Sequence, residues 1–150
     1  MRSSGRSLPL AAILVCTATL AACSSSSPPL CDRCPDVSGV YSTTRTLSGQ
    51  TQCEGAPLPG AVRVLVAQNG SRVTFELEGA VLKGYLYEDG SSTAEGDGSR
   101  DGAPTKIDLS GSFAGDQAGG LRLRADVVET VTQGNPGRSC QVRAFLEGAR

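Results

Sequence analysis

The clearest structural signal in the sequence is the run Asn69-Gly-Ser-Arg-Val-Thr-Phe-Glu-Leu-Glu78. Apolar and polar side chains alternate along it, so that Val73, Phe75 and Leu77 point to one side and the residues between them to the other. Strict alternation over this length is typical of a β-strand with one buried face. An Asn-Gly pair just before such a strand favours a two-residue hairpin turn. The run therefore predicts an antiparallel hairpin whose second strand covers residues 71–78.

The same alternation recurs along the rest of the chain, separated by turn residues such as Asp89-Gly90. Further strands are predicted at 37–47, 61–68, 80–88, 105–113, 121–127 and 140–147, with a short and weakly marked strand at 91–95. Seven or eight sequential strands joined by short turns predict an all-β fold, an antiparallel up-and-down meander. Closing the meander into a small barrel removes its exposed edges, so a closed barrel is the predicted architecture. A two-sheet β-sandwich is the alternative.

The N-terminal part has a different composition. A basic start precedes an apolar run over residues 8–20, which is too short for a membrane-spanning helix of ~20 residues and is typical of a secretory signal. Residues 20–23, Leu-Ala-Ala-Cys, resemble the lipobox of bacterial lipoproteins. This resemblance implies that the thiol of Cys23 carries lipid and that the chain is cut just before it. The alternative is an ordinary secreted protein cut after a small residue.

These features divide the chain into three parts: a signal peptide at 1–22, a lipidated cysteine with a Ser/Pro tether at 23–36, and a β-barrel domain at 37–150. The last part has an ordinary size for one core. The residue after the predicted anchor is Ser24. By resemblance to lipoprotein sorting in Gram-negative bacteria, a serine there favours the outer membrane. The predicted location is therefore the cell envelope, with the protein held at the membrane by lipid.

The number of cysteines agrees with a lipid on Cys23. The chain has six cysteines, of which Cys16 lies in the signal peptide. If Cys23 carries lipid, an even number remains for disulfides in an oxidising compartment, namely Cys31, Cys34, Cys53 and Cys140. Cys31 and Cys34 have the CxxC spacing, but no helical pattern follows them and the chain has no histidine. They are therefore interpreted as a structural disulfide and not as a redox or zinc site.

The predicted barrel suggests how the cysteines pair. Cys53 lies in the loop after the first long strand, and Cys140 begins the last strand. The first and last strands of a closed meander are neighbours, so these two cysteines come within bridging distance. We therefore predict the pairs Cys53–Cys140 and Cys31–Cys34. The alternative is a bridge from Cys31 or Cys34 to one of the other two.

The start of the first predicted strand resembles that of lipocalin-like proteins. The sequence there is Asp36-Val-Ser-Gly-Val-Tyr-Ser, in which Gly39 and Tyr41 correspond to the Gly-x-Trp of these proteins, with Tyr in place of Trp. In lipocalin-like proteins an arginine on the last strand packs over the indole ring. The resemblance implies that Arg143, on the last predicted strand, is the partner of Tyr41.

Residues 97–108 resemble a calcium-binding loop, because oxygen-bearing side chains recur at the ligand positions. The ligands would be Asp97, Ser99, Asp101 and Asp108. Asp in place of the usual last Glu, an internal proline and flanking strands all argue against it. We therefore expect a flexible acidic β-loop and no metal.

Composition narrows the function. A net charge of −1 gives no electrostatic footprint for nucleic acid, and the absence of histidine excludes Ser-His-Asp and Cys-His catalysis. We therefore expect neither an enzyme nor a cofactor. The first functional hypothesis is a lipid-anchored binding module whose barrel holds a small apolar or amphipathic ligand. The alternative is a structural or interaction module of the envelope whose barrel is filled by side chains, and the volume inside the barrel distinguishes the two.

Overall fold

The computed structural model describes residues 28–49, 53, 57–117, 119–134 and 138–150. The predicted signal peptide, Cys23 and residues 24–27 of the tether lie outside the described residues. The strands are β1 (Gly39–Leu47), β2 (Gly60–Asn69), β3 (Arg72–Leu77), β4 (Ala80–Leu86), β5 (Ser91–Arg100), β6 (Ala103–Gly115), β7 (Leu121–Thr132) and β8 (Ser139–Ala149). Within these ranges no helix has the length and apolar character needed to cross a membrane.

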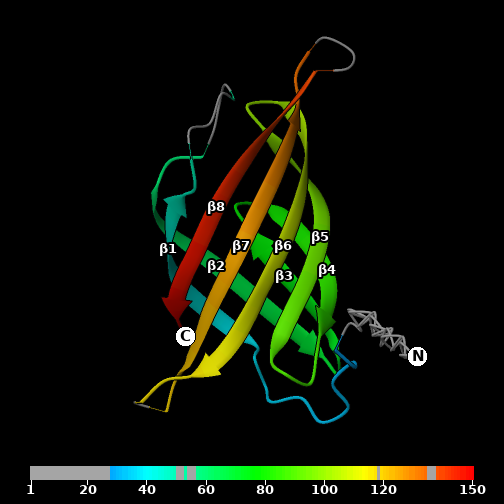
Figure 1. Cartoon of the computed structure of the whole chain (residues 1–150), viewed down its shortest axis with the longest axis vertical. Coiled ribbons are helices and arrows are strands. Elements are labelled where there is room, and N and C mark those ends of the chain that lie inside the picture. The colour runs from blue at the N-terminus through cyan, green and yellow to red at the C-terminus, as the bar shows by residue number, and fades with distance from the viewer. Residues whose placement is uncertain (1–27, 50–52, 54–56, 118, 135–137) are drawn as a thin grey trace, which may run out of the picture.

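The eight strands form one closed antiparallel barrel in chain order (Figure 1). Each strand pairs with the next, and β1 closes the barrel against β8 from Ser42↔Ala149 to Leu47↔Ala144. The predicted up-and-down barrel is confirmed, and the sandwich alternative is wrong. The hairpin predicted first is also present, because β2 and β3 pair through Asn69↔Arg72.

The strand expected at 91–95 is twice as long in the structure, since β5 continues to Arg100. Its second half is rich in glycine and polar residues, which have low strand propensity. Close packing explains the glycines, because a Cβ on Gly96 would lie only 2.5 Å from the backbone oxygen of Val81. The neighbouring strands therefore hold this segment in the sheet.

Inward side chains fill the barrel. Those with no exposed surface at all are Tyr41, Val64, Phe75, Leu82, Leu86, Leu123 and Leu146. The ring of Phe113 lies 5.6 Å from that of Tyr41 and 6.1 Å from that of Phe75, so three aromatic residues pack together in the core. A cavity large enough for water would leave exposed surface on the side chains that line it. The core around these residues is therefore solid.

The chain before β1 covers one end of the barrel, called here the closed end. Leu30 forms a β-bridge with Tyr87, and the backbone of Cys31 donates a hydrogen bond to Leu86. Val37 is completely buried and accepts a hydrogen bond from the hydroxyl of Tyr41. This segment lies across the bottom of the barrel in Figure 1.

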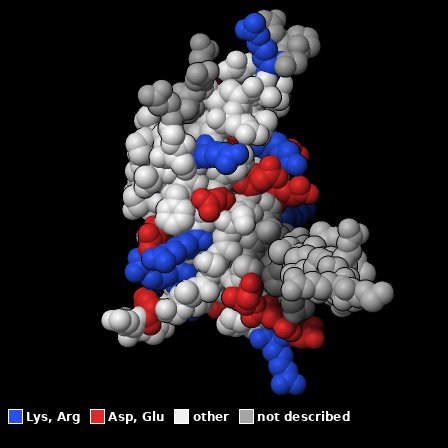
Figure 2. Space-filling model, viewed as in Figure 1, with Lys and Arg blue, Asp and Glu red and all other residues white. Residues whose placement is uncertain are grey.

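Basic and acidic side chains are interspersed on the face of the molecule that Figure 2 shows. Arg122 and Arg124 on β7 both contact Glu147 on β8, and Lys106 lies within 3.5 Å of Glu95 and Asp108. Exposed ion pairs of this kind contribute little to stability. Their mixed signs give no single-sign field on this surface.

Two buried hydroxyl groups differ in a way that predicts opposite mutational effects. The hydroxyl of Ser92 is buried and has no hydrogen-bond partner in the described part of the chain, whereas that of Thr43 donates to the carbonyl of Val62 at 2.8 Å. Ser92→Ala should raise the free energy of unfolding by about 1 kcal/mol, because it removes an unsatisfied polar group. Thr43→Val should lower it by about 1 kcal/mol, because it removes a hydrogen bond. Urea unfolding followed by circular dichroism measures both, and a destabilised Ser92→Ala protein would contradict the expectation.

Candidate functional site

The end opposite the closed end is called here the charged end and is defined by Arg45, Glu78, Arg100 and Glu129. In an up-and-down barrel all odd-numbered strands finish at the same end, so β1, β3, β5 and β7 bring these residues together. Arg45 and Glu129 occupy inward positions near the ends of β1 and β7. Arg100 is the last residue of β5, and Glu78 begins the turn after β3.

The four side chains form one continuous chain of ion pairs. Arg45 Nη2 and Arg100 Nη2 each lie 2.7 Å from the same oxygen of Glu78, Oε2. Arg100 also donates two hydrogen bonds to Glu129, at 2.7 Å from Nε and 2.6 Å from Nη2. This second contact is bidentate, the strongest geometry for a guanidinium and a carboxylate.

Two of the four charged side chains in this network are buried, unlike those of the surface ion pairs. Arg45 keeps 3% of its surface exposed and Glu129 keeps 1%. Burial acts to raise the pKa of Glu78, but the close positive charges of Arg45 and Arg100 and the hydrogen bond from Arg100 outweigh it, so the pKa lies below its ordinary value. The hydrogen bonds from Arg100 to Glu129 and Glu78 raise the pKa of Arg100, against the effect of burial. Glu78 and Arg100 are therefore both charged at neutral pH.

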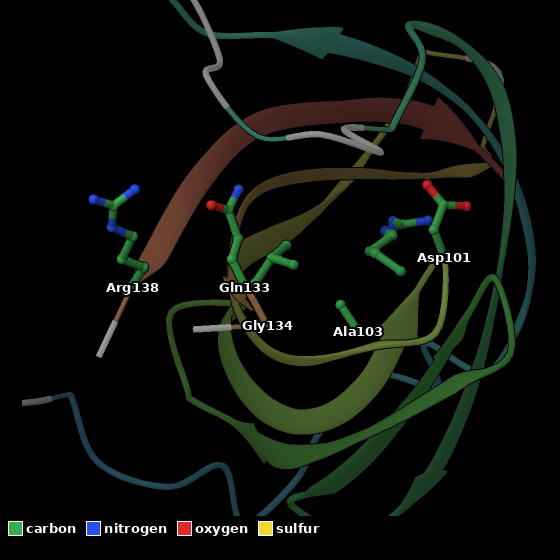
Figure 3. Close-up of a pocket in the computed structure, with 7 residues that line it drawn as sticks. Asp101, Ala103, Gln133, Gly134 and Arg138 are labelled. Atoms are coloured by element: carbon green, nitrogen blue, oxygen red, sulfur yellow. The ribbon is translucent and has the colours of Figure 1, made fainter. Parts of the chain in front are cut away.

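Arg100 lies at the junction of three clefts. One of about 610 Å³ includes Arg45, Glu78 and the segment Pro57–Pro59. A smaller one of about 170 Å³ reaches inward to Thr105. The third, of about 570 Å³, lies between the β5–β6 turn and the β7–β8 loop. Figure 3 shows Asp101 and Arg138 on opposite sides of this third cleft, with Ala103 and Gly134 between them.

Both predicted disulfides are present. Cys53 and Cys140 are bonded, with their Cα atoms 5.6 Å apart, and they tie the β1–β2 loop to the start of β8 at the charged end. Cys31 and Cys34 are bonded to each other at the closed end, with a Cα separation of 5.3 Å. The four cysteines that the structure describes are thus all paired.

The arginine expected beside Tyr41 needs a correction. Gly39 and Tyr41 lie at the start of β1, near the closed end, and Tyr41 points into the core. Arg143 points outward and does not lie near Tyr41. Because β8 runs antiparallel to β1, Arg143 lies opposite Ser48, just beyond the other end of β1. Arg150 is the arginine near Tyr41 instead. A Cβ on Gly39 would overlap the Arg150 side chain, and the charge of Arg150 acts on Tyr41, whose pKa burial raises.

The calcium-loop residues lie on a β-hairpin. Asp97 and Ser99 belong to β5, Asp101 to the turn, and Asp108 to β6, where it contacts Lys106. The segment expected to be a flexible loop is thus mostly strand. Among the residues with described positions, no cluster of three or more carboxylates or cysteines could hold a metal ion.

The charged end was not predicted, although part of it had a signal in the sequence. Glu129 is in phase with the inward residues Ala125 and Val127, and Arg45 is in phase with Tyr41. A charged residue in the apolar phase of a strand indicates a buried ion pair. Glu78 and Arg100 carry no comparable signal, because they lie in a turn and at a strand end.

Fold and site together define a small up-and-down β-barrel with a solid core, one closed end and one charged end. Comparison of the chain with known protein families, with curated proteins and with solved structures finds no match.

Proposed function

We propose that this protein is a lipid-anchored, non-catalytic protein of the bacterial cell envelope whose charged end is its binding surface. The solid core is the observation that carries the choice between the two functional hypotheses, because it favours the filled barrel. A ligand would then meet the protein at its ends or on its outer surface. The clefts around Arg100 make the charged end the best candidate.

The position of the tether supports an orientation for this surface. Leu30, which the structure places at the closed end, follows Cys23 by seven positions in the sequence. A fully extended chain spans about 3.5 Å per residue, so the anchor would hold the closed end within about 25 Å of the membrane. The charged end then faces away from the membrane. The serine after Cys23 favours the outer membrane, and the Gly39 and Tyr41 arrangement favours a lipocalin-like barrel within this proposal.

A non-catalytic role fits the chemistry of the charged end. The chain has no histidine, and the buried carboxylate of Glu129 is neutralised by the two hydrogen bonds from Arg100. A carboxylate whose two oxygens both accept guanidinium hydrogen bonds is occupied by contacts within the protein. The geometry suits recognition of charge instead.

Replacing Cys23 by alanine tests the anchor. Cells that express the wild-type protein with labelled palmitate should label it, and Cys23→Ala should lose the label completely, because the acylated thiol is gone. The same variant should move from the detergent phase to the aqueous phase in detergent partition. Cys16→Ala is the matched control and should keep the label, since Cys16 belongs to the cleaved signal peptide. Label on Cys23→Ala would reject the proposed anchor.

A further inference from the structure

The carboxylate of Glu78 lies where two guanidinium groups of the barrel converge. Arg45 and Arg100 come from β1 and β5, and each places its Nη2 atom 2.7 Å from Oε2 of Glu78. Both arginines are inward-facing and largely buried, whereas the Glu78 side chain keeps 36% of its surface exposed. The two arginines thus form an oxyanion site that is fixed by the barrel and filled from a surface turn.

The carboxylate of Glu78 leaves part of the hydrogen-bonding capacity of the two arginines unused. Nη2 of Arg45 is buried, and among the described residues its N–H groups have no aligned hydrogen-bond acceptor, although the carboxylate oxygen of Glu78 is close. A buried donor without an acceptor is unfavourable. Arg100 differs, because its Nε and Nη2 both donate to Glu129. Arg45 therefore has donor capacity that another acceptor can use.

The backbone of Glu78 is in a conformation that favours other residues. Its φ angle is +49°, and with Gly79 it forms the two-residue turn between β3 and β4. Glycine and asparagine are the usual residues at such a left-handed position, and glutamate is uncommon there. The strained conformation aims a carboxylate at the two arginines. Strain of this kind is concentrated at functional sites.

The cleft beside the three residues has room for a ligand of mixed character. It measures about 610 Å³, and its polar part contains Arg45, Glu78 and Arg100. Its rim contains the apolar segment Pro57–Pro59, in which Leu58 is 80% exposed. An exposed leucine between two prolines offers a stiff apolar contact next to the charged floor.

We propose that this cleft binds an organic carboxylate, whose carboxylate group replaces Glu78 between Arg45 and Arg100 and whose apolar body lies against Pro57–Pro59. With Glu78 displaced, the two arginines and Glu129 carry a net charge of +1, which matches a single carboxylate. Planar carboxylates also fit the fork geometry of guanidinium groups. This inference rests on the part of the proposed function that makes the charged end the binding surface, and it does not require the lipid anchor.

Benzoate and its neutral analogue benzamide test the site on the full-length protein purified as cells export it. Wild-type protein should bind benzoate saturably, with amide shifts at Gly79 and Ser99 in NMR spectra, and should bind benzamide at least tenfold more weakly. Glu78→Gln should bind benzoate at least tenfold more tightly than wild type, because a neutral amide competes less well for the arginines. Glu76→Gln, on the outward face of β3, is the matched control and should bind as wild type does.

The proposal is overturned by the absence of saturable benzoate binding to the wild type, by equal binding of benzamide, or by a Glu78→Gln protein that binds no more tightly. Inorganic phosphate that binds more tightly than benzoate would also overturn it, because the apolar rim would then have no role. Benzoate binding by a protein without lipid on Cys23 would reject the anchor and keep the carboxylate site. Lipid labelling without benzoate binding would reject the site and keep the anchor.

Discussion

Arg100→Met is expected to lower the free energy of unfolding by about 3–5 kcal/mol, because it leaves a buried carboxylate without its counter-ion. Glu129 is 1% exposed, and both of its oxygens accept hydrogen bonds from Arg100. No other cation contacts Glu129 among the ion pairs of the described residues. Chemical denaturation followed by circular dichroism measures the loss.

A second substitution separates the buried charge from the packing of the arginine stem. Arg100→Met combined with Glu129→Met should recover most of the lost stability, because apolar residues of similar volume replace buried ion pairs at little cost. Arg124→Met, which removes an exposed partner of Glu147, is the control and should change stability by less than about 1 kcal/mol. If Arg100→Met costs no more than Arg124→Met, Glu129 does not depend on Arg100.

Removing the Cys53–Cys140 disulfide should cost more stability than removing Cys31–Cys34. The first pair is separated by 87 residues and the second by 3. In the chain-entropy model the longer loop is worth about 4–5 kcal/mol and the shorter one about 2 kcal/mol. The Cys53→Ala/Cys140→Ala and Cys31→Ala/Cys34→Ala proteins, compared by urea unfolding, measure this difference.

Peptide mapping under non-reducing conditions provides the control for this comparison. The wild-type protein should yield one peptide pair linked through Cys53 and Cys140 and one peptide that contains the Cys31–Cys34 bridge. A linked peptide that joins Cys34 to Cys53 or Cys140 would contradict the pairing. Equal losses of stability in the two double variants would show that loop length does not govern these disulfides.

The alternation of residues was sufficient to predict strands and the faces that they bury. Val73, Phe75 and Leu77 all lie in the core, and the Asn-Gly turn joins β2 to β3. This success has a local cause, because a pleated strand turns successive side chains to opposite faces whatever the rest of the chain does. The Cys53–Cys140 pair could be predicted as well, because closure of a meander always makes its first and last strands neighbours.

Sequence alone did not determine the registers around the barrel. The partner of Tyr41 was sought at Arg143 but is found at Arg150, because the pairing of β8 with β1 sets which residue lies opposite. The length of β5 was underestimated for a related reason. The glycines and polar residues of its second half have low strand propensity, and pairing with β6 as far as Arg100↔Ala103 holds them in the sheet.

The charged end shows most clearly which features follow from the sequence pattern and which depend on the tertiary structure. Alternation places Arg45 and Glu129 on inward faces, so two buried charges follow from the sequence. Their connection through Arg100 and Glu78 does not, because it depends on how far each strand extends before it turns and on the registers of all the hairpins between them. Local pattern determines which face a side chain occupies. Only the closed barrel determines which distant side chain it meets.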